Sequence, residues 1–138
     1  MNHYHVLAHC SEEQVCQLAT LVLETYPASQ VKLLSGPRQG LVMLRMRETV
    51  AESLFNAGEI LVTEVRVELD GQFGFGMVIG DSPRQAMAIA LVDAALRKGE
   101  EPADQLTDEL VKLNEAIARD HLRLQQLVAS TTVNFERM

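Results

Sequence analysis

Residues 59–79 read EILVTEVRVELDGQFGFGMVI, and the pattern of this stretch decides the fold. Apolar or β-branched side chains occupy the odd positions of 61–69, and Glu64, Arg66 and Glu68 stand between them. Alternation with a period of two is typical of a strand that is buried on one face and solvated on the other. The sequence therefore predicts a strand with one wet face.

The residues after Asp70 predict the second strand of a hairpin, in which apolar residues alternate with glycines. A two-residue turn at 70–71 would place Val67 opposite Gly74 and would match apolar side chains with the wrong face. We therefore expect a three-residue loop at 69–71, with a left-handed glycine and with Val67 opposite Phe73.

Gly71, Gly74 and Gly76 have the spacing of a phosphate-binding loop, G-x-x-G-x-G, just before a helix. That interpretation fails because Gly74 and Gly76 lie inside a strand and the required strand–loop–helix context is absent. In the expected register Arg66 faces Gly74 and Glu64 faces Gly76, so the glycines bare the open face of the sheet. Two interpretations stay open: a device for twist or a bulge, or an interface where another backbone approaches closely.

The rest of the chain adds strands and helices around this hairpin. SGPRQG, between two β-prone segments, predicts a turn and therefore a second hairpin within residues 30–47. Ser11 and Gln14 form a capping-box pattern at the start of a helix, and a long helix is expected from about residue 103 to 130, followed by the β-prone tail TTVNFERM. We expect an α+β fold in one domain, residues 1–138, with a four-stranded antiparallel sheet and helices packed mainly on one face.

The segment 83–98 predicts a helix that is apolar nearly all round. Pro83 suits its first turn and Gly99 ends it. Gln85, Asp93 and Arg97 form the one stripe expected to be wet. A helix this apolar needs cover on more than one side, from a second helix or from a partner subunit. Its first turn, with Arg84, could hold an anion, although a simple cap explains the same pattern.

Composition excludes several classes of function. The net charge of −7 argues against general nucleic-acid binding. No apolar run approaches the roughly 20 residues of a membrane span, and the N-terminus has no signal pattern, so we expect a cytoplasmic chain without a membrane role. Cys10 and Cys16 stand at no metal or redox spacing. His5 and His9 could share a helical face, but no third ligand stands at a fixed distance, so we expect no metal and no cofactor.

Three segments together resemble the PhnG family, the G subunit of the bacterial carbon–phosphorus lyase system. They are GLVMLRMRET, LFNAGEILVTEVRVELDGQFGFGMVIGDSPRQAMAIALVDAAL and TTVNF, in the family's order and spacing. The resemblance implies a role in phosphonate degradation, in a core complex with the H, I and J subunits. It further implies support for the displacement of adenine from ATP by a phosphonate, which gives ribose 1-methylphosphonate 5-triphosphate. The I subunit is the partner most expected.

The family gives this chain no catalytic residue, and three hypotheses remain. The chain is an assembly subunit without catalytic groups, or it contributes side chains to a shared active site, or it is an independent domain that binds a small ligand. For a shared site the candidate substrate-binding residues are Glu59, Thr63, Glu64, Arg66 and Arg84. Glu59 and Glu64 differ in strand phase and point to opposite faces, so they form a poor acid–base pair.

Overall fold

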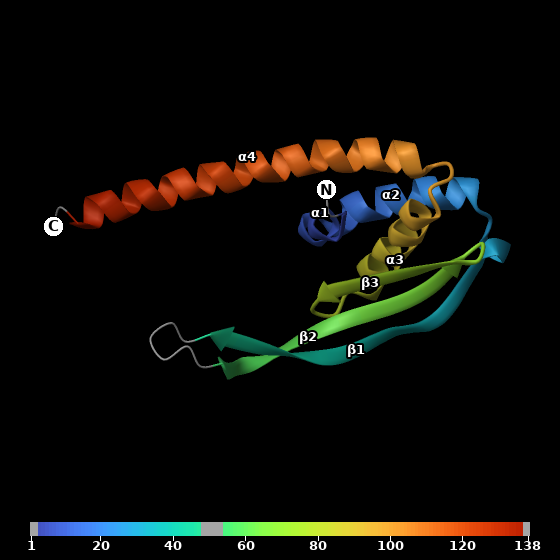
Figure 1. Ribbon diagram of the computed structural model, residues 1–138, viewed down its shortest axis with the longest axis horizontal. Helices are drawn as coiled ribbons and strands as arrows, with labels where there is room; N and C mark the ends of the chain where they lie inside the picture. The colour runs from blue at the N-terminus through green and yellow to red at the C-terminus, as the bar shows by residue number, and fades with distance from the viewer. Residues whose placement is uncertain (1–2, 48–53, 137–138) are drawn as a thin grey trace.

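The computed structural model describes residues 3–47 and 54–136, with side chains described over 3–43 and 58–127 (Figure 1). Over these residues the elements are α1 (His3–His9), α2 (Glu12–Thr25), a 3-10 turn η1 (Ala28–Gln30), β1 (Val31–Arg47), β2 (Leu54–Leu69), β3 (Gln72–Ile79), α3 (Pro83–Lys98) and α4 (Ala103–Glu136). The α+β class and the antiparallel sheet are confirmed. The described sheet has three strands, in the order β1-β2-β3, so the prediction of four strands was wrong.

The error lies in β1, where the segment SGPRQG is a bulge and not a turn. Ser35 pairs with Arg66 and Arg38 with Glu64, so Gly36 and Pro37 together stand opposite a single residue of β2. A bulge absorbs extra residues while the strand continues in the same direction. Gly36 has a φ of +86°, and a Cβ there would lie 2.5 Å from the carbonyl oxygen of Glu64. The sequence therefore places a glycine where the bulge needs it, and the two expected strands are one.

The β2–β3 hairpin has the two-residue turn that the sequence analysis rejected. Leu69 pairs with Gln72 and Val67 with Gly74. Asp70 and Gly71 have φ angles of 46° and 86°, as tight hairpin turns require. The three-residue loop was wrong because cross-strand matching of apolar residues does not set this register. The glycines belong to the buried face, and the phenylalanines of β3 lie on the other face with Arg66.

The register of the β2–β3 hairpin follows from the packing of α3 directly on β3. We call this contact the glycine seat; it consists of Gly74 and Gly76 of β3 with Ala86, Ala90 and Ala94 of α3. A Cβ at Gly76 would lie 2.1 Å from the carbonyl oxygen of Ala86, and one at Gly74 would lie 2.4 Å from that of Ala90. Only glycines let the helix backbone approach the strand this closely. The assignment of Gly74 and Gly76 to the open face, as interface residues for another subunit, is therefore corrected: the backbone that approaches them is that of α3.

Helix α3 has the predicted bounds, and the chain itself covers its apolar surface. Ser82 occupies the N-cap position, and Gly99 ends the helix with a left-handed φ of 74°. β2 and β3 pack on one side of α3, and α2 packs on another, with further contacts from α1 and α4. Of the two covers that the sequence analysis considered for this helix, a second helix or a partner subunit, the structure has the second helix, α2. Asp93 is fully buried, so the expectation that it belongs to a wet stripe was wrong.

Helix α4 lies on the far side of the helical layer from the sheet and runs well past the other helices (Figure 1). Leu106 and Leu110, in its first half, are buried in the core. Every side chain from residue 118 to 127 is exposed. The helix continues to Glu136, so the tail predicted to be β-prone is helical in its backbone up to that residue.

Candidate functional site

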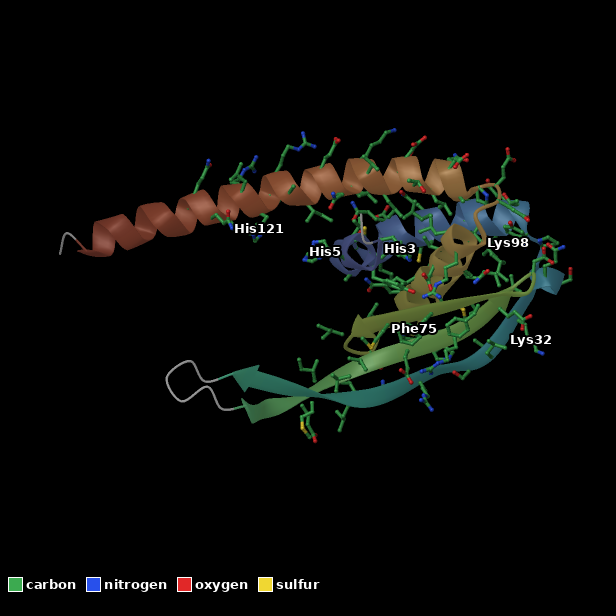
Figure 2. The ribbon with its side chains drawn as sticks, in the orientation of Figure 1. His3, His5, Lys32, Phe75, Lys98 and His121 are labelled. Atoms are coloured by element: carbon green, nitrogen blue, oxygen red, sulfur yellow. The ribbon has the colours of Figure 1, made fainter. Side chains whose placement is uncertain are left out.

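Asp93 joins three elements around its buried carboxylate. Its Oδ1 lies 2.7 Å from Nε2 of His3 on α1 and accepts a hydrogen bond of 3.1 Å from Nε of Arg97 on α3. Its Oδ2 accepts a hydrogen bond of 2.9 Å from the backbone N–H of Phe75, in the edge strand β3. His3 and Phe75 can be followed in Figure 2. A buried carboxylate is tolerated when donors surround it, and here they come from α1, α3 and β3.

Tyr4 and Arg97 extend this cluster toward the surface. Nη2 of Arg97 donates a hydrogen bond to the hydroxyl of Tyr4, and its guanidinium carbon lies 5.8 Å from the centre of the Tyr4 ring. The bond to Tyr4, and then the bond to Asp93, raise the pKa of Arg97. Burial is the largest cause that raises the pKa of Tyr4, and Asp93 adds to it. Both groups therefore keep their protons at neutral pH, and the cluster fastens α1 to α3.

A second charged group lies on the open face of the sheet, where three residues from β1 and β2 meet. Glu64 accepts a hydrogen bond of 2.7 Å from Nε of Arg38 and one of 3.3 Å from Nη1 of Arg66. The bond from Arg38 is the main cause that lowers the pKa of Glu64. The guanidinium carbon of Arg66 lies 5.2 Å from the centre of the Phe75 ring, within the range of a cation–π contact. The fold thus brings together two of the five candidate substrate-binding residues, Glu64 and Arg66.

The other three candidates lie apart from this group. Thr63 is buried on the covered face, where its hydroxyl donates to the carbonyl of Gly80 at 2.6 Å and accepts from the N–H of Ser82 at 3.2 Å. It therefore holds the connection from β3 to α3. Glu59 is exposed on β2, opposite Met43 of β1. Arg84 is exposed in the first turn of α3 and borders a shallow hollow of about 680 Å³ against α2.

A hollow of about 480 Å³ lies where α1 meets α4. Its lining is His5, His9, Asn114, Ile117, Ala118, Asp120, His121 and Leu124, with His5 and His121 labelled in Figure 2. Nδ1 of His9 lies 2.9 Å from the carbonyl oxygen of His5, so the helix itself engages one nitrogen of this pair. In the described part of the chain, no group of three or more His, Cys, Asp or Glu side chains is arranged to hold a metal ion.

The Asp93 cluster is the feature that the sequence analysis missed. The available signal was an aspartate inside a helix of otherwise apolar character, because an unpaired buried carboxylate is costly. Arg97, four residues later on the same helix, forms an ion pair of 3.1 Å with Asp93, as the i,i+4 spacing allows. Nothing in the spacing pointed to His3, which is 90 residues away in the chain.

The fold and these two clusters define a small α+β protein in which the carboxylates of Asp93 and Glu64 pair with arginines of the same chain. Among the helices described, none combines the length and the apolar character needed to cross a lipid bilayer. The family model described as "Phosphonate metabolism protein PhnG" matches residues 2–138. The chain therefore belongs to the PhnG family of phosphonate metabolism, as its sequence segments indicated. A search of the curated proteins gives no match.

Proposed function

We propose that the chain is an assembly subunit of the carbon–phosphorus lyase core complex. In this role it completes and stabilises a complex with the I subunit, and with the H and J subunits. That complex supports the displacement of adenine from ATP by a phosphonate to give ribose 1-methylphosphonate 5-triphosphate. Membership of the PhnG family supports the metabolic setting.

The observation that carries the assembly role is the exposure of apolar side chains on two projecting elements. Leu41 on β1 is 64% exposed and Leu124 on α4 is 60% exposed, and both have exposed apolar neighbours. Leaving a leucine-sized side chain in water forgoes about 1.5–3 kcal/mol. Large exposed apolar surfaces mark interaction sites. On the open face of the sheet, in contrast, Glu64 is engaged within the chain by Arg38 and Arg66.

Co-expression with the H, I and J subunits tests this role. A tagged chain should co-purify with all three in fixed proportion, and omission of the chain should abolish adenine release from ATP in the presence of a phosphonate and the ATP-binding-cassette protein L. The proposal fails if the remaining subunits assemble and release adenine at the full rate without this chain.

The placement of Arg66 favours one alternative, a contribution to a shared active site. Arg66 is partly exposed on the open face and lies beside Phe75, where it could reach an anionic substrate held by a partner. For a pure assembly role, Glu64→Ala and Arg66→Ala should change adenine release by less than about twofold in the intact complex. A loss of more than about tenfold, equivalent to about 1.4 kcal/mol in the barrier, with normal assembly would favour the shared site.

A further inference from the structure

The outer part of the β1–β2 hairpin lacks a third strand among the described residues. β3 pairs with β2 from Val62 to Leu69, and one further hydrogen bond joins the N–H of Gly80 to the carbonyl of Leu61. Residues 40–47 and 54–61, which we call the distal ribbon, extend past the end of β3 and away from α3 (Figure 1). A two-stranded ribbon alone is marginally stable in water, whereas three or more strands are needed for independent stability.

Beside the exposed Glu59, the distal ribbon exposes apolar side chains on both of its faces. Leu41, Val42 and Met43 are consecutive in β1 and all exposed, with Met43 at 49%. Consecutive residues of a strand point to opposite faces. A helix that docked on the ribbon would cover only one of these faces. A strand added at the edge of the ribbon would contribute side chains to both.

The outer edge of β1 has the backbone groups that such a strand needs. β1 is an edge strand of the described sheet, and its backbone pairs regularly with β2 from Arg38 to Leu44. The bulge at Gly36 and Pro37 ends this stretch on one side, and proline offers no N–H. Unpaired N–H and C=O groups along an edge are a template for pairing with another chain.

The charge of β1 selects among possible occupants. Residues 38–47 of β1 contain Arg38, Arg45 and Arg47 and no acidic residue, in a chain of net charge −7; Arg38 is paired with Glu64. Pairing with β1 of a second copy would bring one basic strand against another, which like-charge repulsion opposes. An acidic strand would complement it.

We propose that the outer edge of β1, over residues 38–47, binds an extended segment of a partner polypeptide that is acidic and rich in β-branched apolar residues. This segment pairs as an added strand of the sheet, the mode of recognition called β-augmentation. The identity of the biological partner rests on the proposed assembly role, whereas the chemistry of the segment rests on the distal ribbon.

The experiment uses the full chain and three labelled synthetic peptides of ten residues: a Glu/Val peptide with the repeat Val-Val-Glu-Glu, which places valine on both faces of a strand, a Lys/Val peptide with the same repeat of valine and lysine, and the Glu/Val peptide with two central prolines. In fluorescence anisotropy the Glu/Val peptide should bind at least tenfold more tightly than either of the others. Hydrogen–deuterium exchange should show alternate amides of residues 38–47 slowed at least tenfold by the Glu/Val peptide. This measurement reports backbone pairing in the unmodified chain and does not depend on any variant.

A pair of matched variants locates the binding. Leu41→Glu should weaken binding of the Glu/Val peptide at least tenfold, whereas Leu122→Glu, which adds the same charge at an exposed leucine of α4, should leave it unchanged. Circular dichroism checks that both variants are folded.

The proposal would be overturned by no binding of the Glu/Val peptide, by equal binding of the three peptides or by equal loss in the two variants. Protection of residues 38–47 that rises with chain concentration alone would also overturn it, because it would indicate a second copy as the occupant. An oligouridylate that displaces the Glu/Val peptide at lower concentration would overturn it in favour of nucleic acid. These outcomes need no other subunit, so they are independent of the co-purification that tests the proposed function.

Discussion

Replacing Gly76 by alanine should destabilise the isolated chain strongly, because the added methyl group would meet the backbone of α3. The new Cβ would lie 2.1 Å from the carbonyl oxygen of Ala86 and 2.7 Å from the N of Ala90. An ordinary contact for a Cβ begins near 3.4 Å, so α3 would have to lift by about 1 Å from the sheet. Backbone cannot rotate away as the end of a side chain can. Overpacking of a core typically costs about 1–3 kcal/mol, and we expect the upper end of this range at the glycine seat.

Thermal and urea unfolding of the isolated chain measure this cost. A loss of about 3 kcal/mol would lower the Tm by about 10 °C in a domain of this size. Gly40→Ala is the matched control: Gly40 lies in β1, and a Cβ there would meet nothing within 4 Å. Its stability should stay within about 0.5 kcal/mol of the wild type. If Gly76→Ala keeps the wild-type Tm but loses its partners in co-purification, the glycine seat within the chain is refuted.

Three further predictions concern the charged clusters and the core. Asp93→Asn should cost about 3 kcal/mol in urea unfolding, because it removes the charge from a buried, fully paired carboxylate; a cost under about 1 kcal/mol would contradict the role given to this cluster. Glu64 has a pKa below its ordinary value near 4.5, so its contribution is complete above that pH and lost as the pH falls through the lowered pKa. The stability difference between the wild type and Glu64→Gln should accordingly shrink as the pH falls below about 4.5, and a constant difference would argue against the pairing. Leu110→Ala should cost about 2–5 kcal/mol in the core, whereas Leu122→Ala, at a side chain 55% exposed, should change stability by less than about 0.5 kcal/mol; equal effects would show that α4 is packed differently.

The local features of the fold could be predicted because they depend on neighbouring residues. Alternation at 61–69 identified the strand and its buried face. The capping box of Ser11 and Gln14 is present at the start of α2, and Gly99 ends α3 as expected. Each of these signals works within a few residues of the chain, through a turn of helix or the pleat of a strand.

The features that failed depend on segments distant in the sequence. The register of the β2–β3 hairpin follows from the contact of Gly76 with Ala86 and Ala90, and no pairing rule between two strands contains that information. The bulge at Gly36 keeps β1 in one piece only because β2 is long enough to pair along it. The contact between His3 and Asp93 joins the first helix to the third. The candidate residues Glu64 and Arg66 could be placed on one face because they are two residues apart in one strand. Their partner Arg38 could not be identified, because it lies on another strand, 26 residues from Glu64 in the sequence.

The glycine seat also decides where a partner can bind. Because α3 lies directly on β3 and α2 covers α3, the helix that looked incomplete in sequence is covered by its own chain. The apolar surface available to a partner therefore lies not on α3 but on the elements that extend past the packed layers, namely the distal ribbon and α4 beyond residue 118. Apolar side chains on these elements, such as Leu41 and Leu124, stay exposed although the same chain has a packed apolar core. In the proposed assembly role, the helical layer and the sheet bury each other within the chain, and the distal ribbon is the part that contact with another polypeptide would complete.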